Sequence, residues 1–138
     1  MPVETLIIED SDTFRRILGA WLERLGFQIV GEARSAAEGL ELFHAYNPSL
    51  VTLDLVMPDF EHLSPSDLFF TIRRESPGTA IVVISAHSRN SSAQRFLAAG
   101  AVAYMEKNFM SFDQLAATLK SVFPGLVGHR PIAVSSAT

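Results

Sequence analysis

The stretch LVTLDLVMP, residues 50–58, decides the fold class of this chain. Its first four residues lack the regular polar–apolar alternation of a half-exposed strand. This lack is typical of a strand that is buried on both faces. Asp54 follows that run directly, and Pro58 closes the stretch. A carboxylate among apolar neighbours is costly unless a partner or a metal ion meets it. The stretch therefore predicts a buried parallel strand that ends in a functional acid.

Four further short runs of this kind lie along the chain. They are Thr5–Ile8, Gln28–Gly31, Ala80–Ile84 and Ala103–Met105. Together with Leu50–Leu53 they predict five strands, most of them covered on both faces.

The segments between these runs carry helical periodicity. Apolar residues recur at helical spacing from Phe14 to Leu25, and Gly26 ends that pattern. The other expected starts are Ser35 (a capping box with Glu38), Ser64 (followed by Pro65 and Asp67), about Ser91, and Ser111 (a capping box with Gln114), and the expected ends are marked by Pro48, Gly100 and Pro124. Five successive βα units predict a doubly wound α/β fold, with a five-stranded parallel sheet and helices on both of its faces.

The composition is that of one globular domain. The chain has 138 residues, of which 48% are hydrophobic and 19% are charged, and this excludes a disordered chain or a coiled coil. No cysteine is present, which excludes a disulfide framework, a thiolate metal site and a cysteine nucleophile. Residues 1–123 are expected to form the domain, and residues 124–138 a C-terminal tail or a truncated linker.

The charge and the termini limit the expected partners and location. A net charge of −4 disfavours direct binding of nucleic acid, because a phosphate backbone attracts basic surfaces. The N-terminus lacks the basic region of a signal peptide, and no apolar stretch approaches the length of a membrane span. We therefore expect a cytoplasmic protein with neither nucleic acid nor a membrane as a direct partner.

Polar residues stand where the predicted strands end. Glu9 and Asp10 follow the first run, Asp54 the third, Ser85 the fourth, and Lys107 lies just beyond the fifth. In a doubly wound sheet, ligands bind beyond the carboxyl ends of the strands. Carboxylates brought together there repel one another, and a divalent cation relieves the repulsion; an all-oxygen, partly hydrated site suits Mg²⁺. The alternative is that these acids are solvated turn residues or helix caps.

In this order the motifs resemble those of the receiver domain of bacterial two-component response regulators, from Thr5 to about Phe123. The matching motifs are Ile7-Ile8-Glu9-Asp10 (the acidic pair), Asp54 with Met57-Pro58 (the phosphoacceptor motif), Ile84-Ser85-Ala86 (the Ser/Thr-Ala motif) and Tyr104-Met105-Glu106-Lys107 (the aromatic-x-x-Lys motif). The resemblance implies a flavodoxin-like (βα)5 fold with strand order 2-1-3-4-5.

The resemblance also implies a reaction and a cofactor. Asp54 would accept a phosphoryl group from a sensor histidine kinase or a histidine phosphotransfer protein. Mg²⁺ would be bound by Asp10, Asp54 and the backbone carbonyl of Val56, with Glu9 acting mainly through water. Lys107 would pair with the phosphoryl oxygens. Such a chain is a phosphoacceptor signalling protein and not an enzyme with a separate substrate.

Ser85 and Tyr104 are the switch residues that the resemblance implies. Ser85 would hydrogen-bond the phosphoryl group, and Tyr104 would then turn inward. This would alter the surface formed by the fourth helix, the fifth strand and the fifth helix, a surface that could also form a homodimer. The alternative for Tyr104 is plain packing, since an aromatic residue near a strand end is commonly half-buried.

Several positions depart from the family pattern or have a simpler interpretation. The loop 59–64 is longer than usual, Asn108 stands where proline is frequent, and Glu9 replaces an aspartate. His87 lies two residues beyond the serine of the switch motif, where the family influences hydrolysis, although a lone histidine is more often a packing or surface residue. Asp12 is interpreted as a turn residue or helix cap.

Other functions fit the residues less well. A flavin carrier of the same fold needs an uncharged phosphate loop where this chain has Glu9 and Asp10, and a dehalogenase-type phosphatase needs a second acid where Val56 stands. The alternative that remains is a receiver-shaped scaffold that binds proteins and is never phosphorylated.

Overall fold

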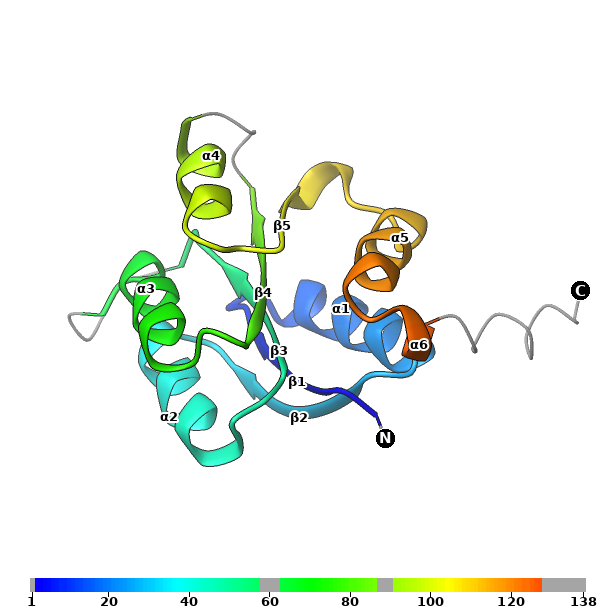
Figure 1. Ribbon diagram of the computed structural model, residues 1–138, viewed down its shortest axis with the longest axis horizontal. Helices are drawn as coiled ribbons and strands as arrows, with labels where there is room; N and C mark the ends of the chain where they lie inside the picture. The colour runs from blue at the N-terminus through cyan, green and yellow to red at the C-terminus, as the bar shows by residue number, and fades with distance from the viewer. Residues whose placement is uncertain (1, 58–62, 87–90, 128–138) are drawn as a thin grey trace, which may run out of the picture.

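The computed structural model describes residues 2–57, 63–86 and 91–127. Their elements are β1 (Glu4–Ile8), α1 (Asp12–Arg24), β2 (Gln28–Ala33), α2 (Ala36–Tyr46), β3 (Leu50–Asp54), α3 (Pro65–Glu75), β4 (Ala80–Ser85), α4 (Ser91–Ala98), β5 (Ala103–Glu106), the 3₁₀ turn η1 (Lys107–Phe109), α5 (Phe112–Val122) and α6 (Pro124–Val127) (Figure 1). The five predicted strands and five predicted helices are confirmed, with ends that shift by a few residues.

The strands form one parallel sheet in the order β2-β1-β3-β4-β5, which confirms the doubly wound, flavodoxin-like fold. Ile8 pairs with Leu53 and Asp54 with Ile84, while Ser85 pairs with Glu106. The last residues of the strands therefore lie along one edge of the sheet. We call this line the carboxyl edge.

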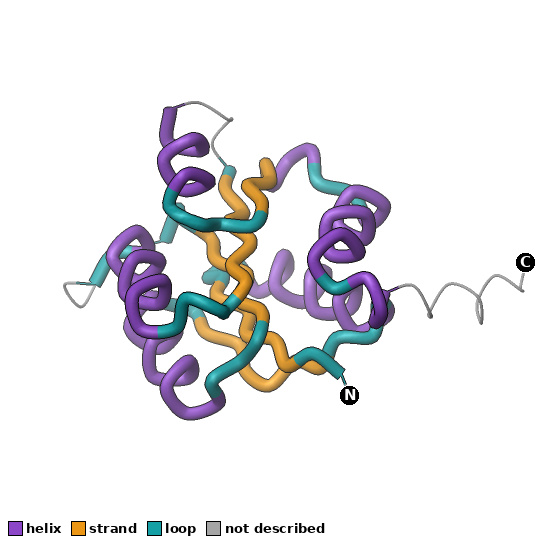
Figure 2. The backbone as a smooth tube through the Cα atoms, in the orientation of Figure 1, coloured by secondary structure: helices purple, strands orange, loops and turns teal. Residues whose placement is uncertain are grey.

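Helices cover both faces of the sheet, as Figures 1 and 2 show. On one face α2, α3 and α4 bury a core around Phe43, Phe69 and Phe96. On the other face α1 and α5 bury a second core around Leu22 and Leu119. All six residues of β4 and all five of β3 are buried, which explains why apolar residues dominate both strands without the alternation of a half-exposed strand.

Three helices, α2, α3 and α5, follow the serine caps that the sequence predicts. Ser64 and Ser111 each form a reciprocal capping box with the residue three positions later. At the start of α2 the prediction of a capping box was only half right, because Ser35 accepts from the backbone N–H of Glu38 while the Glu38 carboxylate accepts from the N–H of Arg34.

Two local features differ from the sequence predictions, at the start of α1 and after α5. The cap of α1 is Ser11, whose side chain accepts from the N–H of Phe14, and Asp12 is the first helical residue. The segment after β5 is a 3₁₀ turn that contains Asn108. A short helix, α6, begins at Pro124, where the sequence shows no helical period. Residues 128–138 lie outside the described part of the chain.

No helix in residues 2–57, 63–86 and 91–127 combines the length and the apolarity that a membrane span requires.

Candidate functional site

Asp54 is the last residue of β3 and lies at the centre of the carboxyl edge. Its side chain is almost fully buried, with 1% of the residue exposed. The backbone N–H of Val56 donates to Asp54 Oδ1 at 2.9 Å, which holds the carboxylate against the turn that leaves the strand. Val56 itself is partly exposed, so this turn borders solvent.

Glu9 and Asp10 follow β1 and meet Asp54 at this edge. Glu9 is 2% exposed, whereas Asp10 is exposed. The backbone N–H of Glu9 donates to the carbonyl of Ala33 on β2 at 2.9 Å, and its carboxylate accepts from the N–H of Ser11 at 2.9 Å. One carboxylate oxygen from each of Glu9, Asp10 and Asp54 lies within 4.8 Å of the other two. We call these three residues the acidic cluster.

Lys107 brings a positive charge to the cluster from the end of β5. Its Nζ lies 3.0 Å from each carboxylate oxygen of Glu9 and 3.2 Å from Asp54 Oδ2. The ammonium also lies over the ring of Phe14, 4.7 Å from its centroid, an arrangement in which the ring attracts the cation. One cation therefore joins two buried carboxylates that come from different strands.

Burial changes the acidity of these groups. Removal from water raises the pKa of Asp54 and of Glu9, and it outweighs the hydrogen bonds from Val56, Ser11 and Lys107 that lower these pKa values. Burial alone would lower the pKa of Lys107, but its hydrogen bond to Glu9 and the charges of both carboxylates raise it overall. Lys107 is therefore cationic at neutral pH, and the cluster carries more negative than positive charge once its acids ionise.

The residues of the cluster suit a divalent cation. All of the donors are oxygens, and two of the three acids are almost fully buried, where like charges repel most strongly. Hard cations such as Mg²⁺ take carboxylate and carbonyl oxygens and keep some water. The exposed position of Asp10 leaves the site open on the solvent side.

Ser85 ends β4 at the carboxyl edge, whereas Tyr104 lies two residues before that edge, where it pairs with Val83. Tyr104 is 5% exposed and packs in the core beneath α3 and α4 with Val83. Ser85 is 1% exposed, and it follows Val83 by two residues, which puts both side chains on one face of the strand. The carboxyl edge thus brings together Glu9, Asp10, Asp54 and Lys107. The alternation of β4 assigns Ser85 to the face of the sheet that holds Val83 and Tyr104.

Two residues that contact the site were missed from the sequence. The apolar periodicity places Phe14 only on an apolar helical face, and no sequence motif marks Arg15. Arg15 donates from Nη1 to the backbone carbonyl of Glu9 at 2.8 Å. The spacing of Arg15 indicates that it is buried, because positions 15, 18, 19 and 22 form the buried side of α1. The predictions for residues 59–62 of the longer loop and for His87 lie outside the described residues.

Comparison with known proteins identifies the family. The sequence model of the response regulator receiver domain matches residues 5–120. This chain belongs to that family. Receiver domains are the signal-receiving domains of two-component response regulators, so the chain is a signal-transduction domain of such a system.

Several relatives of this receiver domain have been described. The transcriptional regulatory protein PdtaR of Mycobacterium tuberculosis is 34% identical over 117 residues, which are 85% of this chain and 55% of PdtaR. The chain thus spans about half the length of that relative. The chemotaxis protein CheY of Bacillus subtilis is 27% identical over 117 residues, which are 85% of this chain and 95% of CheY.

Solved structures agree on the receiver fold. CheY in the CheX-CheY-BeF3-Mg complex of Borrelia burgdorferi superposes with a TM-score of 0.79 at 24% identity, and it covers 89% of this chain and 90% of its own. A receiver domain protein from Clostridium thermocellum has a TM-score of 0.76 at 25% identity, over 86% of this chain and 92% of its own.

Proposed function

We propose that this receiver domain accepts a phosphoryl group on Asp54 in a reaction that depends on Mg²⁺. The observation that carries the proposal is the acidic cluster, whose three carboxylates lie within 4.8 Å of one another with Lys107 Nζ 3.2 Å from Asp54. The donor is a sensor histidine kinase or a histidine phosphotransfer protein, the partners of a two-component receiver.

In this proposal Asp10, Asp54 and the backbone carbonyl of Val56 hold Mg²⁺, and Glu9 contributes mainly through water. A cation held by these residues would supply positive charge that offsets the carboxylates and the incoming phosphoryl oxygens. The support for this assignment is the all-oxygen donor set and the partial burial of the cluster.

Asp54 is the nucleophile. A carboxylate oxygen of Asp54 forms a bond to phosphorus while the bond from phosphorus to the donor breaks, and the donor leaves with the electron pair. Lys107 and Ser85 stabilise the charge on the phosphoryl oxygens, because phosphoryl transfer is accelerated mainly by positioning and charge neutralisation. The role of the chain is to receive the group and change state, and it acts on no separate substrate.

The change of state reaches the surface of α4, β5 and α5 through Ser85 and Tyr104. A shallow hollow of about 730 Å³ lies on this surface, lined by residues of β5 and α5 and by Leu97 and Phe109. Phe109 is 73% exposed. We propose that this surface contacts the output partner or a second copy of the chain when Asp54 is phosphorylated.

The remaining assignments follow from the same proposal. Residues 1–123 form the receiver unit and residues 124–138 a tail or linker. The domain works in the cytoplasm, where histidine kinases present their phosphoryl groups, and it has neither nucleic acid nor a membrane as a direct partner.

The test is phosphorylation by a small donor. Wild-type protein and the variants Asp54→Asn and Asp113→Asn are incubated with acetyl phosphate, with and without Mg²⁺, and are separated on a phosphate-affinity gel. We expect a retarded band for the wild type and for Asp113→Asn, an exposed acid of α5, and only with Mg²⁺. Equal labelling of Asp54→Asn would refute the assignment of the site. Absence of labelling in every sample would favour the scaffold.

A further inference from the structure

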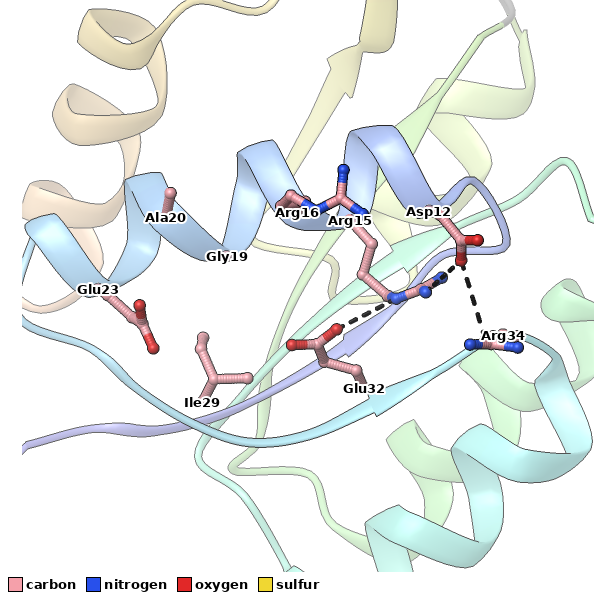
Figure 3. Close-up of a pocket in the computed structure, with 9 residues that line it drawn as sticks. All are labelled: Asp12, Arg15, Arg16, Gly19, Ala20, Glu23, Ile29, Glu32 and Arg34. Carbon is pink, nitrogen blue, oxygen red and sulfur yellow. Dashed lines mark hydrogen bonds and ion pairs between the residues drawn. The ribbon is translucent and has the colours of Figure 1, made fainter.

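A charged hollow of about 470 Å³ lies between α1 and β2, and no residue of the acidic cluster is part of its lining (Figure 3). Its charged lining comes from Asp12, Arg15, Arg16, Glu23, Glu32 and Arg34. Arg15 differs from the other two arginines, because only 9% of its side chain is exposed, whereas Arg16 and Arg34 are exposed. The hollow therefore lies directly outside the buried guanidinium group of Arg15.

All three nitrogens of that guanidinium have partners from different parts of the fold. Nε donates to Glu32 Oε1 on β2 at 3.1 Å, and Nη2 donates to Asp12 Oδ1 in the first turn of α1. Nη1 donates to the backbone carbonyl of Glu9 at 2.8 Å in a buried hydrogen bond. Figure 3 shows the side chain reaching from α1 toward β2, between Glu32 and Asp12.

The contact with Glu9 is the one that bears on the site. The carbonyl of Glu9 belongs to the peptide group that joins Glu9 to Asp10, and a peptide group is planar. Holding that plane restricts the backbone angle on each side of it, which sets the directions in which both side chains leave the chain. On the other side, the N–H of Glu9 is held by the carbonyl of Ala33 at 2.9 Å.

We infer that Arg15 is the positioning residue of the acidic cluster: by holding the Glu9–Asp10 peptide against α1 and β2, it aims both carboxylates at Asp54. Its consequence for cation binding rests on the proposed function. The backbone arrangement of Glu9 and Asp10 does not, and it can be measured on the protein without metal.

Arginine is the side chain that this geometry needs. Its planar fork presents several donors in fixed directions, while lysine offers one nitrogen on a flexible stem. A lysine at position 15 keeps the charge but reaches fewer than the three acceptors, which come from Glu9, Asp12 and Glu32. The inference therefore predicts that Arg15→Lys fails to restore the site.

The experiment compares Arg15→Gln and Arg15→Lys with two matched controls. Arg16→Gln removes the neighbouring, exposed positive charge. Leu22→Val shortens a fully buried side chain at the far end of the same helix, so it lowers stability without touching Glu9. Amide spectra are recorded on the metal-free proteins, and the Mg²⁺ dissociation constant is then measured by calorimetry under conditions where every variant is folded.

We expect both Arg15 variants to move the amide signals of Asp10 and Ser11 and to weaken Mg²⁺ binding about tenfold, the effect typical of losing a group that orients a metal ligand. Both controls should keep the wild-type values. Unchanged amide signals and an unchanged Mg²⁺ constant in Arg15→Gln would overturn the inference, as would an equal loss in Leu22→Val. If the wild type itself bound no Mg²⁺, the proposed function would fail, and the metal-free amide signals would still decide whether Arg15 positions the peptide.

Discussion

On the face of the sheet covered by α1 and α5, the carboxyl edge carries ionised groups: Glu9, Asp54 and Lys107 are joined by contacts of 3.0 and 3.2 Å. On the face covered by α2, α3 and α4, Tyr104 packs in the core, and the alternation of β4 assigns the buried Ser85 to the same face. The first face is under electrostatic strain, because two buried acids share one cation. The second face is a packed core.

This difference suggests a division of work across the thickness of the sheet. An added charge has the largest electrostatic effect where charged groups are already concentrated and poorly hydrated. A packed core responds by moving between discrete arrangements, because it is close to crystal density. The α1/α5 face is thus suited to receive a phosphoryl group and the α4 face to convert that event into a change of shape.

The largest expected effect comes from removing the charge of Asp54. In metal-free buffer at pH 7, Asp54→Asn should raise the free energy of unfolding by about 1–2 kcal/mol, because burial disfavours the ionised form of Asp54 more than its partners favour it. Lys107 keeps its contact with Glu9 at 3.0 Å, so the variant retains one balanced ion pair. Urea unfolding followed by circular dichroism measures the change.

The gain should depend on pH, with a sign set by burial. Burial raises the pKa of Asp54 above its ordinary value of 3.8, so the folded state binds the proton more tightly than the unfolded state. The wild type therefore loses stability as the pH rises from about 3.8 through the raised pKa. The advantage of Asp54→Asn should be absent below this window and complete above it. Asp113→Asn should show no such profile, and a less stable Asp54→Asn at pH 7 would contradict the strain on this face.

The sequence predicts the carboxyl edge better than it predicts the contacts behind it. Asp54 and Ser85 could be placed at strand ends because a change from apolar to polar residues marks the end of a buried strand. The face of the sheet to which Ser85 belongs depends on how the side chains alternate up to the last residue of β4, and that needs the strand bounds and the register. The four residues of α6 are too few to show a helical period.

Arg15 illustrates the remaining gap. Its burial could be inferred from its spacing with the other buried residues of α1, but its partners could not. Glu32 lies seventeen residues away. The group of Glu9 that accepts from Arg15 is its backbone carbonyl, so the identity of the Glu9 side chain gives no indication of this contact. Such contacts depend on how α1 sits against β1 and β2, which follows from tertiary packing and not from local pattern.

A second, smaller effect should come from adding Mg²⁺. At a concentration ten times its dissociation constant, the ion should stabilise the wild type by about 1.4 kcal/mol, because it binds only the folded cluster. Asp10→Asn should remove most of this gain with little cost of its own, since Asp10 is exposed. Thermal unfolding with MgCl₂, and with NaCl at equal ionic strength, measures it. Equal stabilisation of Asp10→Asn would place the ion elsewhere.

Ser85→Ala should cause the smallest change in stability, about 1 kcal/mol or less for the loss of one hydrogen-bonding hydroxyl. This variant nevertheless tests the division between the two faces most directly. Beryllium fluoride with Mg²⁺ mimics the phosphoryl group, and amide spectra report where the chain responds. In the wild type we expect changes near Glu9 and Asp10 and across residues 91–123. In Ser85→Ala the first set should persist and the second should fall by at least half, because the charge still arrives on the α1/α5 face but the hydroxyl that conveys it to the α4 face is gone.

Tyr104→Phe, which keeps the ring in its core and removes only the hydroxyl, distinguishes the role of the Tyr104 hydroxyl from that of the Ser85 hydroxyl. If Ser85→Ala left both sets as in the wild type, the signal would cross the sheet by another route and the division of work proposed for its two faces would be wrong.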